Sequence, residues 1–315
     1  MSPREYYADE QVRLILGDAL EGLREMPDES VDCIVTSPPY FGLRDYGVDG
    51  QYGLETSPAE YVETMRAVFA EAKRVLAKDG TCWINIDDSY SAGGQGGNRG
   101  GNLTGGDHDH VARPTRVPGY GPKNLLLVPD RLRIALQDDG WNVRNKGIWH
   151  VTNSMPESVT DRLSHCYESV DLFTRSQRYW FDLDAIREPH RAPERIAGAS
   201  AFRARNASLP RTATAPYAGP SARGRNPGDV WAFGTRPYPE AHFAVMPVEL
   251  ALRCIKAGCK PGGTVLDPFS GSGTTGEAAR KLGRRYIGID LSEDYHQLAI
   301  KRFAQGVLDF GAGAA

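Results

Sequence analysis

Cysteine is scarce in this chain of 315 residues, and no two of its cysteines form a C-x-x-C pair. The five thiols are Cys33, Cys82, Cys166, Cys254 and Cys259. An odd, sparse number in a chain of this length favours reduced thiols in a cytoplasm over a disulfide framework. The fold is instead expected to rely on the sizeable core that its 40% hydrophobic residues can bury.

Long apolar runs are missing as well. No stretch of eighteen or more apolar residues occurs, which excludes a transmembrane helix. The first residues, MSPREYYADEQ, are polar and acidic and lack the apolar centre of a signal peptide. We therefore expect a cytoplasmic protein without a membrane partner.

The patterns that are present alternate between strand and helix. Strand patterns occupy 11–17, 31–35, 81–86, 141–151, 167–174, 264–267 and 285–290. Helix patterns occupy 57–80, where Gly80 is expected to end the helix, then 247–259, 275–282 and the residues after 292, and regular structure is also expected over 125–136. Such alternation predicts an α/β fold with a largely parallel sheet.

Charge is unevenly distributed along the chain. The net charge is −3, yet residues 187–225 hold eight arginines against two glutamates, a local +6 that leaves −9 for the rest. A lysine-free, arginine-dense segment predicts a phosphate-binding surface. The same stretch is rich in Ala, Pro, Gly and Ser, so a solvated loop is the alternative. A basic loop that orders on DNA would satisfy both interpretations.

A glycine loop lies near the C-terminal end of the chain. Residues 271–276 read G-S-G-T-T-G between a strand and a helix, and Asp290 ends the next strand 17 positions after Gly273. This pattern is typical of nucleotide-type sites, where an acid accepts from ribose hydroxyls; a plain strand-to-helix turn is the alternative. Only 39 residues follow Gly276, so strands from earlier in the chain must complete the sheet. Asp267, which ends the strand before the loop, suits a cationic amino-acid group better than a pyrophosphate.

A second motif, Ser37-Pro38-Pro39-Tyr40, directly follows a buried strand pattern. The two prolines fix φ and remove two backbone donors, which leaves rigid carbonyl acceptors. Tyr40 adds a flat ring beside them. Acceptors next to a stacking ring suit a planar base whose exocyclic amine is held by its hydrogens. A proline-rich turn that only ends the strand is the alternative.

With these two motifs in this order, the sequence resembles the amino-methylating DNA methyltransferases, which use S-adenosylmethionine to modify cytosine N4 or adenine N6. The Ser-Pro-Pro-Tyr turn comes first, the basic segment next and the Phe-x-Gly-x-Gly loop last, as in the β group of that family. The resemblance covers most of the chain, including 148–158 and 242–247. It implies a single catalytic domain over 1–315, with a Rossmann-like, mostly parallel sheet of seven strands and a circularly permuted motif order.

The resemblance also assigns roles to residues. Those expected to bind S-adenosylmethionine are Asp18, Asp267, Phe269, Gly271, Ser272, Gly273, Thr274 and Asp290. The catalytic turn is Ser37, Pro38, Pro39 and Tyr40. Residues 91–123 are expected to form a flexible glycine-rich insert, and 187–238 a target-recognition segment in which Arg203, Arg205 and Arg211 contact DNA. Double-stranded DNA is the expected partner, with a cognate restriction endonuclease and a second copy of the chain as further candidates.

The implied chemistry fits the residue types. An exocyclic amine is a poor nucleophile because its lone pair delocalises into the ring; acceptors at Ser37 and the Pro38 carbonyl would localise that pair for in-line attack on the sulfonium methyl. The base must leave the duplex and stack, here on Tyr40.

No Pro-Cys dipeptide occurs, which argues against methylation of a ring carbon. No metal is expected, because His108 and His110 lie in glycine-rich surroundings without further clustered ligands. Asp87 and Asp88, at a strand end, could form an acid pair, but solvent or hydrogen-bonded turn roles are favoured.

Cytosine N4 is favoured over adenine N6 as the target. Family members with Ser at this position mostly act on cytosine, and a Ser37 hydroxyl could donate to cytosine N3 while the Pro38 carbonyl accepts from N4. Adenine N1 offers a similar acceptor, so this sets a preference. An RNA, protein or small-amine methyltransferase is a further alternative, as is a catalytically silent DNA-binding module. The arginine segment weighs against the first. Against the second stand the intact motif residues Ser37, Asp267, Gly271 and Gly273.

The arginine segment generates a direct prediction. Neutralising Arg203, Arg205 and Arg211 together should weaken DNA binding and flatten its salt dependence, by up to about one unit of log–log slope per lost phosphate contact. Fluorescence anisotropy across a salt series measures this slope. An unchanged slope would mean that these arginines do not meet phosphates.

Overall fold

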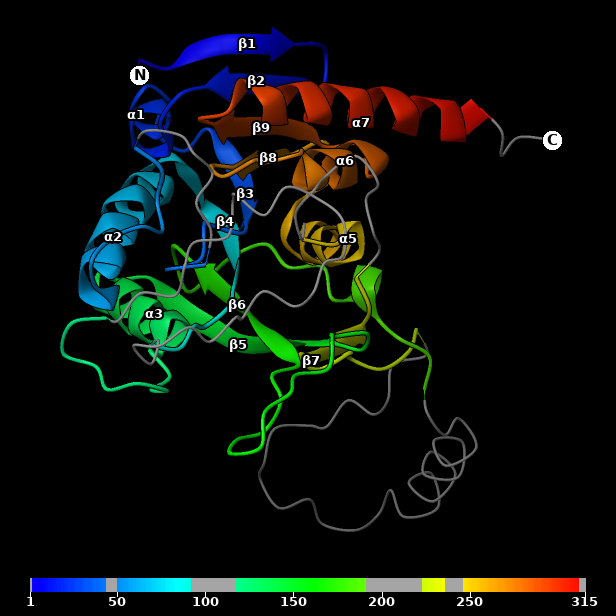
Figure 1. The fold of residues 1–315 in the computed structure, drawn as a ribbon. Coiled ribbons are helices and arrows are strands. Elements are labelled where there is room, and N and C mark those ends of the chain that lie inside the picture. Colours follow the sequence, from blue (N-terminus) through cyan, green and yellow to red (C-terminus); the bar gives the residue numbers. More distant parts are fainter. Residues whose placement is uncertain (1, 44–49, 92–116, 191–222, 236–245, 312–315) are drawn as a thin grey trace, which may run out of the picture.

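One mixed sheet organises the chain, whose computed structural model describes residues 2–43, 50–91, 117–190, 223–235 and 246–311, the last seven by backbone alone. Its strand order is β1-β2-β9-β8-β3-β4-β6-β5-β7 (Figure 1). The strands are β1 (Arg4–Ala8), β2 (Val12–Leu16), β3 (Val31–Thr36), β4 (Leu76–Ile86), β5 (Asn142–Val151), β6 (Tyr167–Thr174), β7 (Val230–Phe233), β8 (Thr264–Asp267) and β9 (Arg285–Asp290). The run from β2 to β4 is parallel, whereas β1 and β6 pair antiparallel with their neighbours.

Helices cover both faces of this sheet (Figure 1). They are α1 (Ala19–Arg24), α2 (Pro58–Val75) and α3 (Val128–Asp138) on one side, and α5 (Val248–Gly258), α6 (Thr274–Lys281) and α7 (Glu293–Gly311) on the other; a short 3-10 helix, η1, spans Asp184–Ile186. Successive side chains of β3 alternate between the two resulting cores, with Ile34 in one and Cys33 and Val35 in the other. In the part of the chain that is described, no helix is both long and apolar enough to cross a bilayer.

The expected α/β class and mostly parallel sheet are confirmed, and the described residues form nine strands where seven were expected. The seven from β2 to β5 in sheet order make up the predicted set, and the short edge strands β1 and β7 extend it on either side. The predicted helix end at Gly80 is wrong. Helix α2 ends at Val75, and Gly80 lies inside β4, where Leu76 already pairs with Val31 of β3.

The sheet order brings the two sequence motifs together. Strands β8 and β9, from the end of the chain, insert between β2 and β3, so earlier strands complete the sheet as expected. Strands β3 and β8 are parallel neighbours, with Cys33 opposite Val265 and Ile34 opposite Leu266. Their carboxyl ends therefore meet at one edge of the sheet, and ligands of open α/β sheets bind at such edges.

A buried ion pair joins α3 to strand β6 of the sheet. Two nitrogens of Arg133 donate to Asp171 Oδ2 of β6, at 3.0 and 2.8 Å, while the arginine also reaches Asp130 at 2.5 Å. Asp171 is 2% exposed. Burial nevertheless raises the pKa of Asp171 to about 6. Its charge in the folded protein thus depends on Arg133.

Replacing Arg133 with leucine should therefore lower the free energy of unfolding by about 3 kcal/mol at pH 8, because an unpaired carboxylate stays buried. The loss should shrink at pH 5, where Asp171 takes up a proton. Urea titrations at both pH values measure this. The double variant Arg133→Leu/Asp171→Leu should recover much of the loss, and the surface variant Arg24→Leu should change little. Equal losses at both pH values would contradict the account.

Candidate active site

A pocket of about 290 Å³ opens where β3 and β8 end. The turn after β3 lines it on one side and the glycine loop after β8 on another. Its wall holds all four residues of the Ser37–Tyr40 turn and most of the residues expected to bind the cofactor, namely Asp267, Phe269, Gly271, Ser272, Thr274 and Asp290. The sequence motifs, more than 200 positions apart, thus form one cavity.

Asp267 sits at the junction of the two motifs. Its Oδ1 accepts from Thr36 Oγ1 at 2.7 Å and from the backbone N–H of Phe269 at 3.1 Å. The side chain is 3% exposed, and burial raises its pKa to about 6. The ring of Phe269 lies edge-on to that of Tyr52, which also lines the pocket. Asp267 therefore links β3 to β8 and places a carboxylate in the pocket wall.

The glycines of the loop serve different purposes. Gly271 has φ of +50°, and no atom of the described residues lies within 4 Å of the position a Cβ would take, so its backbone borders open pocket space. Gly273 has φ of +78°, but a Cβ there would come within 2.7 Å of Ala299 on α7. Gly273 thus allows helix packing, whereas Gly271 leaves room for a ligand. Beside them Ser272 Oγ is buried and has no hydrogen-bond partner within the described chain.

Asp290, at the end of β9, holds the glycine loop from the other side. Its Oδ2 accepts from the Gly271 N–H at 2.7 Å and its Oδ1 from the Ser292 N–H at 2.8 Å. Burial raises its pKa to about 6. Each carboxylate oxygen can accept more than one bond, so both retain capacity for hydroxyls of a ligand.

Asp18 has a structural task beside the pocket. Its Oδ1 caps α1 by accepting from the Glu21 N–H at 3.0 Å, and its Oδ2 accepts from Tyr52 Oη at 2.6 Å. The residues on either side of it, Gly17 and Ala19, line the pocket, whereas Asp18 itself does not. Its predicted contact with the cofactor stays a prediction, and its observed effect is to hold Tyr52 in place.

The Ser-Pro-Pro-Tyr turn is fixed by polar contacts. Ser37 Oγ donates to Tyr40 Oη at 3.2 Å, and Tyr40 Oη donates to Glu168 Oε2 of β6 at 2.6 Å. The carbonyl of Pro39 accepts from Tyr61 Oη at 2.9 Å. The Ser37 hydrogen expected to reach cytosine N3 is used within the turn, because the Tyr40 hydroxyl has only one hydrogen to give and gives it to Glu168. Ser37 therefore faces the pocket as an acceptor.

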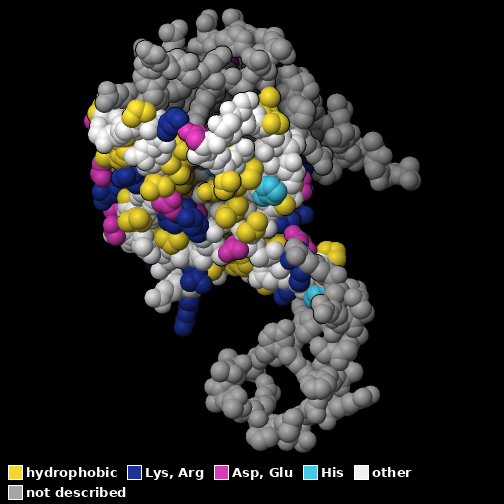
Figure 2. Space-filling view, turned by 60° about the horizontal axis from the view of Figure 1, so that its bottom comes forward, with side chains coloured by type: hydrophobic (Ala, Val, Ile, Leu, Met, Phe, Trp, Pro, Cys, Tyr) yellow, Lys and Arg dark blue, Asp and Glu magenta, His cyan; other side chains and the backbone are white. Residues whose placement is uncertain are grey.

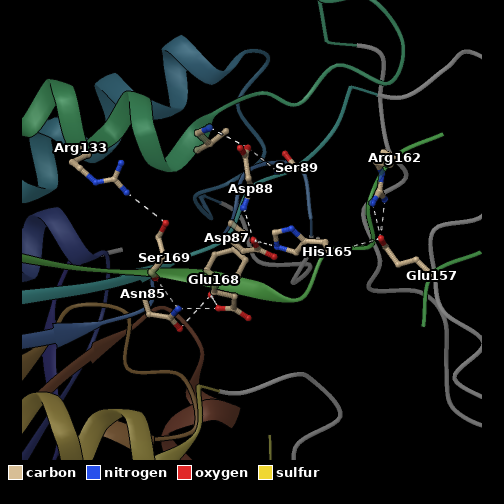
Figure 3. A network of polar contacts seen from close by, with 12 residues as sticks. Asn85, Asp87, Asp88, Ser89, Arg133, Glu157, Arg162, His165, Glu168 and Ser169 are labelled. Carbon is tan, nitrogen blue, oxygen red and sulfur yellow. Dashed lines mark hydrogen bonds and ion pairs between the residues drawn. The ribbon is translucent and has the colours of Figure 1, made fainter. Parts of the chain in front are cut away.

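Sequence reasoning missed Glu168 in this pocket, and it favoured a turn or solvent role for Asp87 over an acid pair. Glu168 and Asp87 line the pocket, and Asp87 Oδ1 lies 2.7 Å from His165 Nε2 (Figure 3). The bond to Asp87 raises the pKa of His165. The expected turn role holds for Asp88, which accepts from the Ser89 and Val128 N–H groups. The one signal for Glu168 was an acid at the second position of a strand whose last six residues are buried.

Several expectations lie outside the described residues. They concern His108, His110, Arg203, Arg205, Arg211, most of 91–123, and 191–222 and 236–238 within the 187–238 segment. The described arginines of that segment pair with acids of the same chain, as Arg187 and Arg223 do with Asp184 and Arg225 does with Glu188. On the face shown in Figure 2, Lys and Arg side chains likewise lie among Asp and Glu. A phosphate-binding surface on this segment stays a prediction.

Comparison with known proteins gives consistent matches. Residues 31–301 match the model of the family described as DNA methylase. The Type II methyltransferase M.Cfr9I of Citrobacter freundii is 42% identical over 289 residues, covering 92% of this chain and 86% of that protein. M.SmaI of Serratia marcescens, also a Type II methyltransferase, is 39% identical, with coverage of 92% and 90%.

Solved structures share the fold. The PvuII DNA methyltransferase, described as cytosine-N4-specific, superposes with a TM-score of 0.65 at 18% identity, covering 95% of this chain and 88% of that one. A putative DNA modification methylase of Thermus thermophilus, complexed with S-adenosyl-L-methionine, gives 0.57 at 23% identity, with coverage of 93% and 94%.

Proposed function

The chain belongs to the DNA methylase family that its residues 31–301 match, and from that premise we propose that its target is the exocyclic N4 amine of cytosine in double-stranded DNA. It is an S-adenosylmethionine-dependent DNA methyltransferase of the N4/N6 type. The observation that carries the proposal is that the Ser37–Tyr40 turn and the glycine loop line one and the same pocket. A methyl donor and an acceptor amine must share one cavity to react, and the two motifs supply its two sides.

The glycine-loop side fits the methyl donor. Open space at Gly271 allows close approach of a ligand, and the Asp290 carboxylate can accept from ribose hydroxyls. The Ser272 hydroxyl, which has no hydrogen-bond partner among the described residues, offers the ligand another contact. The buried Asp267 carboxylate suits a cationic group, and Phe269 and Thr274 complete this wall. When bound, S-adenosylmethionine supplies an electrophilic methyl group on a sulfonium sulfur.

The turn side fits a flipped base. Ser37 Oγ and the Pro38 carbonyl accept the two hydrogens of the amine, and Tyr40 and Pro39 provide flat walls for the ring. Holding both hydrogens localises the nitrogen lone pair and aims it at the methyl carbon. Transfer would form the N–C bond as the C–S bond breaks, and the nitrogen would then lose one of its hydrogens as a proton to water. The residues thus act by positioning and electrostatics.

Cytosine is favoured on two grounds. The turn begins with Ser37, a short neutral acceptor, and in the family that the sequence resembles, members with Asp at this position mostly act on adenine and those with Ser mostly on cytosine. The PvuII enzyme, which shares the fold, is described as cytosine-N4-specific. The relatives M.Cfr9I and M.SmaI are Type II methyltransferases, which supports a cognate restriction endonuclease as the partner in the cell.

Gly271→Val should abolish binding of S-adenosylmethionine in isothermal calorimetry while the protein stays folded, because the new side chain fills the space left for the ligand. Gly283→Val is the matched control. Gly283 also has a positive φ, +66°, and nothing within 4 Å of its Cβ position, but it lies outside the pocket. The control should carry similar backbone strain and still bind. Equal affinity of both variants would sink the assignment of the loop.

The purified enzyme should convert cytosine in DNA to N4-methylcytosine. To test this, genomic DNA from an unmethylated host is treated with the enzyme and S-adenosylmethionine and is then digested to nucleosides. Mass spectrometry of the nucleosides identifies the methylated product. Ser37→Ala should lose most of the rate, about 10²–10³-fold, since it removes one positioned partner of the amine. N6-methyladenine as the sole product would overturn the proposed target.

A further inference from the structure

A directed series of hydrogen bonds runs from Ser37 to a glutamate on the neighbouring wall of the pocket. Ser37 Oγ donates to Tyr40 Oη, which donates to Glu168 Oε2. Asn85 Nδ2 donates to the same oxygen at 2.9 Å and to the carbonyl of Ser169 at 3.2 Å (Figure 3). The two acceptors fix which end of the Asn85 amide faces Glu168. Every hydrogen in the series therefore points toward the glutamate.

The carboxylate of Glu168 sets this direction. An ionised carboxylate can only accept, so the single hydrogen of Tyr40 must point at it, and the Tyr40 oxygen is then left as an acceptor. That oxygen takes the hydrogen of Ser37. The lone pairs of Ser37 Oγ are thereby left for a ligand. A contact of 3.4 Å between Tyr40 Oη and Asn85 Oδ1 is longer than the 2.6 Å bond to Glu168 and does not compete with it.

The surroundings of Glu168 do not explain it as a stabilising group. Within the described residues, no lysine or arginine forms an ion pair with it. The groups that face it are Tyr40 after β3, Asn85 and Asp87 at the end of β4, and His165 before β6. Across the sheet, Trp149 of β5 is its register partner. A partly buried carboxylate in a pocket wall, without lysine or arginine to pair with among the described residues, is more typical of function than of stability.

We propose that Glu168 is a positioning residue for methyl transfer, which through Tyr40 orients the hydroxyl of Ser37 as an acceptor for the amine of the base. The inference rests on the proposed function and deepens it, because it explains why a serine, which can donate or accept, acts as an acceptor here. Tyr40 then has two roles. Its ring contacts the base, and its hydroxyl, which donates to Glu168, orients the hydroxyl of Ser37.

Protonation of Glu168 would reverse the series. A neutral carboxyl group can donate to Tyr40, whose hydrogen then turns toward Ser37, and the Ser37 hydrogen turns into the pocket. The Ser37 O–H would then face the N–H groups of the amine, and two donors cannot form a hydrogen bond with each other. Burial raises the pKa of Glu168, although Tyr40 and Asn85 lower it and Asp87 and His165 act in opposite directions. Methyl transfer should therefore fail on the acid side, as pH falls through a pKa above the usual glutamate range.

The pH profile of single-turnover methylation tests this dependence. Glu168→Gln keeps an acceptor for Tyr40 and Asn85 but cannot take up a proton, so it should retain most of the plateau rate and lose the acid limb. Glu168→Leu removes the acceptor and should lose about 10-fold at the plateau, the worth of one oriented hydrogen bond. Glu63→Gln on α2, an exposed glutamate paired with Arg66, is the control and should keep the wild-type profile. An unchanged acid limb in Glu168→Gln would overturn the proposal.

A double-mutant cycle tests whether Tyr40 acts through Ser37. Tyr40→Phe keeps the ring and removes the hydroxyl, so it should slow single turnover by about 10-fold with unchanged affinity for S-adenosylmethionine. In the Ser37→Ala background the same change should have no further effect, because the group to be oriented is gone. Independent, multiplicative effects would contradict the proposal. Thermal melting of each variant identifies a change that merely unfolds the protein.

These outcomes are separable from failure of the proposed function. Rates are scored on whichever methylated nucleoside the wild-type enzyme forms. If that product is N6-methyladenine, the cytosine assignment falls, yet the coupling between Glu168, Tyr40 and Ser37 can still be measured on the adenine amine. If the product is N4-methylcytosine and the coupling is absent, only the inference about Glu168 falls.

Discussion

The pairing of β3 with β8 is the constraint on which the site depends. These parallel neighbours come from opposite halves of the chain, and their shared edge is where the Ser37 turn and the glycine loop meet. A buried bond of 2.7 Å between Thr36 and Asp267 closes this junction beyond the last ladder pair. Strands β8 and β9, from the end of the chain, lie between β2 and β3, and this topology creates the pocket. It also determines where each side chain of the pocket lies.

The pocket is electrostatically suited to a positively charged ligand. Asp267, Asp290 and Glu168 all line it, and burial raises the pKa of each. Over the described part of the chain, none of the three forms an ion pair with lysine or arginine. A sulfonium donor with an ammonium group brings positive charge to them, so its binding should offset the cost of holding these carboxylates out of water. On the side of the pocket that would hold the base, the acceptors are the neutral Ser37 Oγ and Pro38 carbonyl. Neutral acceptors suffice there, because the amine loses only one proton after methyl transfer.

Sequence reasoning could predict the parts of the site that follow from local pattern. The glycine loop, the proline turn and the strands β3, β6, β8 and β9 are marked by residue types whose conformational preferences act over a few positions. What failed depends on distant partners. Gly80 reads as a helix end until Leu76 is seen to pair with Val31. Glu168 lies 128 positions from Tyr40, so no local pattern relates the two, and the direction of the Ser37 hydroxyl follows only from their contact.

A crystal structure with S-adenosylhomocysteine tests the central claim most directly, namely that one pocket holds the methyl donor with its sulfur facing the Ser37–Tyr40 turn. The account predicts the ribose hydroxyls at Asp290, the amino group near Asp267 and the sulfur directed at Ser37 and Pro38, with the Tyr40–Glu168 bond retained. A ligand bound elsewhere, or bound with its sulfur turned away from Ser37, would contradict it.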